Sequence, residues 1–305
     1  MSFTTELMTG AVLGGTPILY AALGESVSER AGVINLGTEG SMLVGALAGY
    51  AVTAESGNPW IGLAGAALGG ALLSSIHGFF VLWRKTNQLA TGLVVLFLAL
   101  GLTSLFGVNY VQSTINSFQS IDVPLLSNIP FFGEVFFQQT APVYVSYALV
   151  PLLSLFLFRT RPGLYVRAAG ERAQVLTTYG RPVRLVQMLA VVGGGALAGI
   201  GGGVLSTAYT NAWFENMVQG RGFVAVAVAV FAARSPYKVM AGAYLFGAAF
   251  ALSPLLQVHG VGINQFALDA LPYVLVIVVL TVIGRRGTSP APEGLQAVFE
   301  GGASQ

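Results

Sequence analysis

Long apolar stretches, separated by short polar segments and by Gly and Pro, occupy most of the 305-residue chain. A helix needs about 20 apolar residues to cross the ~30 Å hydrocarbon layer of a membrane, and most of these stretches are that long. The pattern predicts nine membrane-spanning helices, at residues 5–22, 38–54, 60–83, 89–110, 141–158, 185–209, 221–233, 237–254 and 268–284. The predicted fold class is therefore all-α, a polytopic integral membrane protein with about eight to ten transmembrane helices.

Composition agrees with a membrane protein. Charged residues make up 9% of the chain, against about 25% in a soluble domain, and hydrophobic residues make up 54%. No polar linker divides the chain, so residues 1–286 are predicted to form a single transmembrane domain. The Gly-, Pro- and Ser-rich tail at residues 287–305 is expected to be disordered in the cytoplasm. Because the first basic residue is Arg30, no cleaved signal peptide is expected.

Positive charge gathers in one loop. The segment from Arg159 to Arg184 holds six of the fourteen Lys and Arg residues, and the flanking runs 135–158 and 185–214 hold no charge. Basic residues are retained on the cytoplasmic side of a membrane, so this loop is predicted to be cytoplasmic. With nine spans, thirteen basic residues then lie inside, Arg221 lies outside, and the two termini lie on opposite sides.

The segment from Gly24 to Gly40 interrupts the apolar pattern with the ionisable residues Glu25, Glu29, Arg30 and Glu39. A charge at the centre of a bilayer costs about 2.5–3.5 kcal/mol, so these side chains cannot face lipid. The segment is either an ordinary cytoplasmic loop or a broken helix near the N-terminus that lines a polar cavity. Discontinuous helices of the second kind carry substrate contacts in membrane transporters. The pattern alone leaves both interpretations open.

Three colinear stretches resemble one family. They are SERAGVINLGTEGSMLVGA, then GLYVRAAGERAQVLTTYG followed by GGGALAGIGGGVLSTAYT, then NMVQGRGFVAVAVAVFAARSPYKVMAGAYLFG. The chain is similar, over roughly residues 10–285, to permease subunits of ATP-binding cassette (ABC) importers for nucleosides and simple sugars, within the branched-chain amino acid and ribose permease superfamily. Members with about ten spans have an extra N-terminal helix, which is not expected within this sequence, so the resemblance leaves the side of residue 1 open.

This resemblance implies a multi-pass protein of a bacterial or archaeal cell membrane, which moves nucleosides or related simple sugars while a separate ATP-binding subunit hydrolyses ATP. It further implies an extracytoplasmic solute-binding protein and a second, homologous permease subunit, more often as a heterodimer than as a homodimer. Membrane lipid is an expected partner, and nucleic acid is not. The alternative is a stand-alone secondary transporter or channel for a small polar solute, which would need a coupling-ion carboxylate in mid-span.

The basic loop contains a candidate coupling element. Residues Gly170 to Leu176 are predicted to form a short helix after Gly163, ended by Gly180 and Pro182. The resemblance implies that this helix docks in a groove of the ATP-binding subunit, through Arg167, Gly170, Glu171, Arg172, Ala173 and Gln174. A short rigid helix transmits a rigid-body displacement better than a flexible loop does. The alternative is a solvated loop that only fixes orientation.

Polar residues in or beside the spans are candidates for the solute path. The set is Asn35, Thr38, Glu39, Gln88, Asn109 and Asn211, with Thr91, Tyr110, Thr207, Tyr209, Ser253 and Gln257 as further members. Such residues more commonly hold helices together, at about 0.6 kcal/mol each. Asn35 and Glu39 stand out because helix breakage and the family motif coincide there.

Glycine and histidine positions indicate helix packing, and they do not indicate a nucleotide or metal site. The spacing of Gly195, Gly199 and Gly203 places small residues on one helical face and predicts close helix packing. The chain has no phosphate-binding GxxxxGK[ST] motif, so we expect no ATP hydrolysis by this chain. No Ser/His/Asp arrangement or carboxylate pair at useful spacing occurs either, so no other enzyme activity is expected. His77 is expected to be a packing residue, His259 lies in an outer loop, and no metal site or cofactor is predicted.

Aromatic residues mark the side opposite the basic loop. The outer segment from Val111 to Thr140 has no Lys or Arg but several Phe, so we expect it to lie along the membrane interface or to meet a partner subunit. Trp60 and Trp213, near span ends, fit an interfacial belt of aromatic residues.

Overall fold

The computed structural model describes residues 2–111, 113–260, 264–284 and 295. The long helices are α1 (Phe3–Arg30), α2 (Thr38–Ser56), α3 (Pro59–Trp83), α4 (Gln88–Gly107), α6 (Ala141–Arg159), α9 (Val183–Val204) and α11 (Pro236–Val258). Helix α4 continues into the 3-10 turn η1 (Val108–Tyr110), and α9 continues into the π-helical turn η2 (Leu205–Tyr209). The all-α fold class predicted from the sequence is confirmed.

Short elements connect these helices. On one end of the bundle lie the two-stranded sheet of β1 (Ser120–Asp122) and β2 (Gln138–Thr140), with α5 (Phe132–Phe136) between the strands. On the other end lie α7 (Arg161–Glu171) and α8 (Ala173–Thr178). The remaining helices of the described residues are α10 (Arg221–Phe231), α12 (Gln265–Asp269) and α13 (Leu271–Gly284).

Six helical segments among the described residues are long and apolar enough to cross a membrane: α1, α3, α4 with η1, α6, α9 with η2, and α11. The other three predicted spans do not meet both criteria of length and apolar composition. Helix α2 has the length but a less apolar sequence, and most of its residues are buried while the last three are exposed. Helices α10 and α13 have 11 and 14 residues, and 11 residues make only about 16 Å of helix. Helix α10 therefore reaches about halfway through the bundle.

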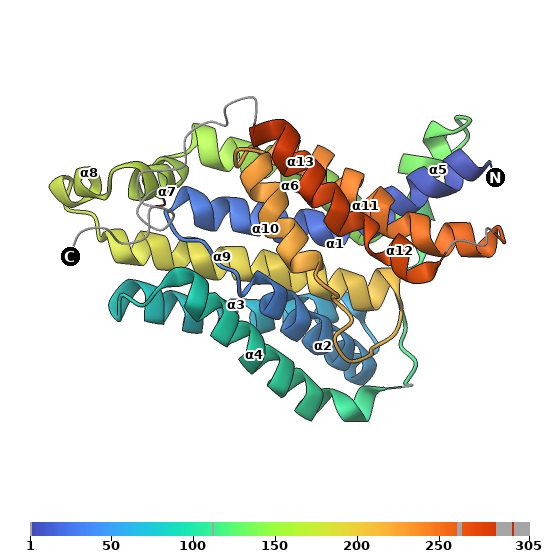
Figure 1. The fold of residues 1–305 in the computed structure, drawn as a ribbon, viewed down its shortest axis with the longest axis horizontal. Helices are drawn as coiled ribbons and strands as arrows, with labels where there is room; N and C mark the ends of the chain where they lie inside the picture. Colours follow the sequence, from blue (N-terminus) through green and yellow to red (C-terminus); the bar gives the residue numbers. More distant parts are fainter. Residues whose placement is uncertain (1, 112, 261–263, 285–294, 296–305) are drawn as a thin grey trace.

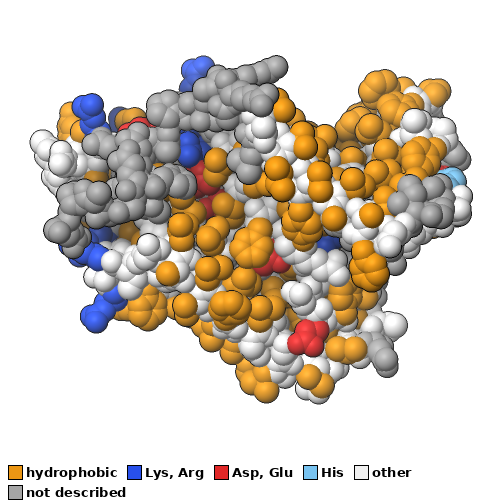
Figure 2. Space-filling view, viewed as in Figure 1, with side chains coloured by type: hydrophobic (Ala, Val, Ile, Leu, Met, Phe, Trp, Pro, Cys, Tyr) orange, Lys and Arg blue, Asp and Glu red, His pale blue; other side chains and the backbone are white. Residues whose placement is uncertain are grey.

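Lys and Arg side chains gather at the end of the bundle that carries α7 and α8, at the left of Figure 2. The N-terminus lies at the opposite end (Figure 1). We call the end with α7 and α8 the cytoplasmic end and the other the outer end, following the retention of positive charge inside. Arg285, Arg286 and the predicted tail lie outside the described residues, apart from Leu295.

Helices α1, α2 and α9 pack together at the centre, α3 and α4 cover one side, and α6, α11 and α13 cover the other (Figure 1). Glycine allows this packing, as the sequence predicts. A Cβ added at Gly45 of α2 would lie 2.4 Å from the Cα of Gly199 in α9, and one at Gly199 would lie 2.2 Å from the backbone oxygen of Ala66 in α3. The three backbones are therefore in direct contact around Gly199.

Two expectations about helix ends are wrong. Helix α1 does not end near residue 22 but continues to Arg30, because the polar side chains of its last turns find partners inside the protein. The predicted coupling helix from Gly170 to Leu176 is two helices, with a break at Arg172, whose extended backbone (φ −150°, ψ 84°) separates α7 from α8. Gly180 does end α8, in a left-handed conformation (φ +68°).

Trp213 does not join an interfacial belt. Its side chain is buried and packs against Gly107 at the end of α4. Trp60, at the start of α3, is half exposed and makes an edge contact with Phe118, so its place agrees with the predicted belt.

Candidate functional site

A buried polar cluster fixes the reversal between α1 and α2. The chain turns back at residues 31–37, which brings Asn35 and Thr38 beside Glu25 of α1. The Glu25 carboxylate accepts hydrogen bonds from the Asn35 backbone N–H and the Thr38 hydroxyl, both at 2.9 Å. All three residues are buried. A carboxylate can remain inside a helical bundle when its oxygens accept hydrogen bonds in this way.

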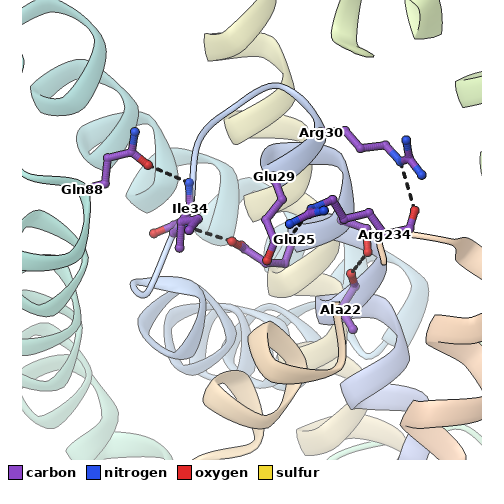
Figure 3. Close-up of polar contacts among 9 residues, drawn as sticks. Ala22, Glu25, Glu29, Arg30, Ile34, Gln88 and Arg234 are labelled. Carbon is purple, nitrogen blue, oxygen red and sulfur yellow. Dashed lines mark hydrogen bonds and ion pairs between the residues drawn. The ribbon is translucent and has the colours of Figure 1, made fainter. Parts of the chain in front are cut away.

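The reversal is also tied to α3 and α4. The Asn35 side chain accepts from the Gly37 N–H at 2.9 Å and donates to Ser74 of α3 at 3.3 Å. His77, also on α3, is buried and its Nε2 lies 3.1 Å from the Ile34 oxygen, in agreement with the packing role predicted for it. Gln88, at the start of α4, accepts from the Ile34 N–H at 2.8 Å (Figure 3). The reversal is therefore a rigid element inside the bundle.

This cluster lies deep in the bundle. Gly24, next to Glu25, packs against Gly194 of α9, and a Cβ at Gly24 would be 2.3 Å from the Gly194 oxygen. Gly194 lies eleven residues after the start of α9 at Val183, or about 16 Å along the helix axis. Helix α9 with η2 is 27 residues long, so the cluster is near its middle. Irregular backbone at such a depth occurs where it is buried in protein or lines a water-filled cavity.

Glu39 binds the start of α10. Its two carboxylate oxygens accept from the backbone N–H groups of Gly220 and Gly222, at 2.7 and 2.6 Å. The first N–H groups of any helix lack helical partners, and a carboxylate there also interacts favourably with the helix dipole. Position 222 must be glycine, because a Cβ would lie 2.4 Å from the Cα of Glu39. The half-length helix α10 thus begins in the middle of the bundle and is capped by α2.

An irregular polar segment leads from the outer end of the bundle to the start of α10. Residues 210–220 connect η2 to α10, and Asn211, Asn216 and Gln219 have left-handed backbone conformations. The side chains of Asn211, Glu215, Asn216 and Gln219 are exposed. Ser104 of α4 donates a hydrogen bond to Glu215. We call residues 210–220 the re-entrant segment.

Arg221 holds the inner end of the re-entrant segment, where the segment joins α10. Its guanidinium is buried, donates to the backbone oxygen of Val218 at 3.1 Å, and lies 4.5 Å from the ring centre of Phe250 in α11. A cation over an aromatic face is a favourable contact away from water. The sequence analysis placed Arg221 on the outer side, and this expectation is wrong, because the re-entrant segment carries Arg221 into the interior of the bundle.

Comparison with known proteins identifies the family. The family of branched-chain amino acid transport system permease components matches residues 7–283. The chain belongs to this permease family. No solved structure matches the chain.

Three relatives of this permease have named solutes. A putative glucose ABC transporter permease protein of Haloferax volcanii is 43% identical over 251 residues, which cover 81% of this chain and 76% of the relative. A nucleoside ABC transporter permease protein of Lactococcus lactis is 30% identical over 305 residues, covering 96% of each chain. A guanosine ABC transporter permease protein of Bacillus subtilis is 30% identical over 304 residues, covering 95% of each. Haloferax volcanii and Bacillus subtilis each have a second, less similar permease that matches, again named for glucose and for guanosine.

The predicted path residues of the permease do not meet at one point. Asn35, Thr38 and Glu39 are buried near mid-depth and their polar groups bond to the chain itself. Gln88 is at the cytoplasmic end, while Asn109 and Asn211 are exposed at the outer end. Glu215, Asn216 and Gln219 were not singled out from the sequence. The signal that could have found them is their place between two apolar runs, in a segment too polar to face lipid.

The coupling loop of the permease has an inner and an outer side. Gly170 is buried, and the Arg167 guanidinium lies 5.4 Å from the centre of the Phe158 ring. Glu171, Arg172, Ala173 and Gln174 are exposed, and five of the six residues of α8 are exposed, Leu176 being buried. The Arg181 guanidinium lies 5.2 Å from the Tyr165 ring centre and holds the end of the loop against α7. The loop is therefore anchored on one side and free on the other.

A cytoplasmic groove adjoins the coupling loop. It has a volume of about 760 Å³ and is lined by Gln88, Lys85, Glu171, Arg172, Gln174 and Gln187, together with neighbouring residues. Among the described residues, no group of three or more His, Cys, Asp or Glu side chains could hold a metal ion. His259 instead pairs with Glu6 of α1 at 2.9 Å, at the outer end.

Proposed function

We propose that the chain is the membrane-spanning permease subunit of an ABC importer for nucleosides or related simple sugars. The observation that carries the proposal is the exposure of α8. This short helix projects from the cytoplasmic end of the bundle (Figure 1), whereas α7 packs against the bundle. An element of this kind can receive the movement of a separate ATP-binding subunit. The chain has no phosphate-binding motif, so ATP hydrolysis is assigned to that subunit.

The solute path is proposed to follow the re-entrant segment, with Asn109 and Asn211 at its outer mouth and Glu39 at its inner end. Glu215, Asn216 and Gln219 are exposed on the way, and irregular polar backbone is tolerated within a membrane only against water or protein. Nucleosides and sugars are neutral and rich in hydroxyl groups, so amide and carboxylate side chains suit them better than a charged clamp. In this scheme, Asn35, Thr38 and Gln88 hold the reversal that positions Glu39.

A second, homologous permease is proposed to cover the face that carries the re-entrant segment. Lipid cannot solvate the exposed Glu215 and its neighbours, so another membrane subunit must face them across a watery path. The pairs of permeases named for one solute in Haloferax volcanii and in Bacillus subtilis support a heterodimer. An extracytoplasmic solute-binding protein would deliver the solute at the outer end.

A stand-alone secondary transporter is the second candidate. The observation in its favour is that Glu25, Glu29 and Glu39 are buried in the bundle, where a coupling ion could bind. Each of the three, however, has a protein partner: backbone and hydroxyl donors for Glu25 and Glu39, and Arg234 for Glu29. Solute accumulation by the purified chain alone in liposomes, without ATP, would favour this candidate over an importer subunit.

The solute proposal is tested by uptake. We expect cells that contain this chain and its partner subunits to take up radiolabelled purine nucleosides in an ATP-dependent manner, and cells that lack only this chain to lose that uptake. Ribose and glucose are added as unlabelled competitors. Competition by glucose but not by nucleosides would shift the assignment to simple sugars, and uptake that is unchanged without the chain would contradict the proposed function.

The coupling proposal is tested on the free side of the loop. We expect Ala173→Trp and Glu171→Arg to leave folding intact, because both side chains are exposed, yet to lower uptake at least tenfold by disturbing a packed interface with the ATP-binding subunit. Thermal unfolding in detergent checks folding, and transport in proteoliposomes checks coupling. Undiminished uptake in both variants would place the ATP-binding subunit elsewhere.

A further inference from the structure

Both ends of α10 are held by buried glutamates. Glu39 binds the N-terminus, as described above. Beyond the C-terminus, the turn at residues 232–235 leads into α11, and Arg234 in this turn donates from Nε to Glu29 of α1 at 2.8 Å. The Glu29 side chain is fully buried and that of Arg234 is 9% exposed. A buried ion pair of this geometry resists separation, because each charge would be left buried without its partner.

The turn has a backbone that depends on its surroundings. Ala233 and Arg234 both have left-handed conformations, with φ of +47° and +57°. Non-glycine residues rarely adopt this conformation, and consecutive ones persist only where neighbouring contacts enforce it. Besides the backbone hydrogen bonds of the turn itself, two contacts from α1 hold it: the Glu29–Arg234 pair and a hydrogen bond of 3.0 Å from Arg30 Nε to the Arg234 backbone oxygen (Figure 3). The end of α1 is therefore tied directly to the turn after α10.

The same end of α1 contacts the coupling loop. The Arg30 guanidinium lies 4.9 Å from the ring centre of Phe158, and the Arg167 guanidinium of α7 lies 5.4 Å from that ring. Gly170, in the last turn of α7, touches the α1 backbone: a Cβ there would lie 2.2 Å from the Arg30 oxygen and 2.9 Å from the Gly32 nitrogen. No side chain separates the two backbones. A displacement of α7 must therefore move the end of α1 or break this contact.

We propose that Glu29, Arg30 and Arg234 transmit the displacement of the coupling loop to α10, and through α10 to the mid-depth junction with Glu39. The inference rests on the proposed function as an ABC importer subunit and adds to it the link between the two sites. The three residues act by positioning α10 and do not contact solute.

The test compares two carboxylates of α1 in the complete transporter, reconstituted in proteoliposomes with its ATP-binding and solute-binding subunits. Glu29→Gln keeps the side-chain shape but removes the charge that holds Arg234. We expect normal ATP hydrolysis with uptake per ATP reduced about tenfold, the loss of a coupling free energy of typical size. Glu6→Gln is the matched control, because Glu6 lies on the same helix and pairs with His259 after α11 at the outer end. Its uptake per ATP should be unchanged.

A distance measurement distinguishes transmission of a displacement to α10 from a purely structural role of these residues. The chain has no cysteine, so spin labels can be attached through Phe223→Cys on α10 and Ile76→Cys on α3, both exposed positions. We expect ATP binding to change the distance between the labels in the otherwise native transporter and to leave it unchanged with Glu29→Gln. If Glu29→Gln does not fold, Arg30→Gln takes its place, because it removes the contact with Arg234 but keeps the ion pair.

The outcomes distinguish the inference from the function on which it rests. A native transporter that neither hydrolyses ATP nor imports nucleosides or sugars contradicts the proposed function. A native transporter that works, with uptake per ATP and label distances unaffected by Glu29→Gln, overturns the link. An equal loss with Glu6→Gln also overturns it, since the effect would then be a general response to the loss of a side-chain contact on α1.

Discussion

Replacement of Gly199 by leucine is expected to abolish accumulation of folded protein in the membrane. Gly199 lies where α2, α3 and α9 cross, and a Cβ there would be 2.2 Å from the Ala66 oxygen. The neighbouring atoms belong to backbone, so no change of rotamer can make room. Separating three helices at the centre of the bundle costs several times the ~1–3 kcal/mol of an ordinary overpacked site, a large part of a typical stability of about 5–15 kcal/mol.

The same helix provides the control. Gly193 has no heavy atom within 4 Å of an added Cβ, so Gly193→Leu should give a normal yield. Both variants are made with a fluorescent fusion, and the monodisperse fraction after detergent extraction is measured. A native yield for Gly199→Leu would mean that α9 does not pack against α2 and α3 as described.

Glu39→Gln is expected to destabilise the protein and to lower uptake at least tenfold. The native carboxylate accepts from the N–H groups of Gly220 and Gly222 with separate oxygens. An amide offers one oxygen and turns its NH₂ group toward the second N–H, so a buried donor is left unpaired at a cost of about 1–3 kcal/mol. The charge that complements the start of α10 is also lost. The solute path would be disturbed at its inner end.

Glu55→Gln is the matched control for this prediction. Glu55 is on the same helix but is exposed near its outer end, where it accepts a hydrogen bond from Tyr110 at 2.7 Å. Because water can replace that contact, we expect a small change in melting temperature and normal uptake. Thermal unfolding and transport are measured together for both variants. If the two variants had the same melting temperature and the same uptake, the capping of α10 by Glu39 would not be needed for stability or transport.

The sequence predicted the elements whose signals are local. Helices α2, α3, α4, α6 and α9 begin and end within a few residues of the predicted spans, because apolar length and flanking charge decide membrane helices. Glycine spacing at Gly195, Gly199 and Gly203 correctly predicted the packing face of α9, because small residues one turn apart let backbones meet.

The sequence predicted the coupling loop only in part. Its position, charge and Gly180 stop were evident in the sequence. Its division at Arg172 was not, because α7 is held by tertiary contacts: Gly170 meets the backbone of Arg30, 140 positions earlier in the sequence, and Arg167 lies over the Phe158 ring. Those contacts also decide that Arg167 and Gly170 face inward, whereas Ala173 and Gln174 remain available to a partner.

The sequence by itself determined that this is a helical membrane protein, in which loop its basic residues gather, and which permease family it resembles, since composition, charge distribution and motifs are properties of the chain alone. Only the tertiary structure decided what the ionisable residues near the N-terminus do. Glu25 and Glu29 continue α1 and do not break it, because Thr38 and Arg234 reach them from other segments. A buried charge is stable only beside its partners, and those partners lie up to 205 positions away in the sequence.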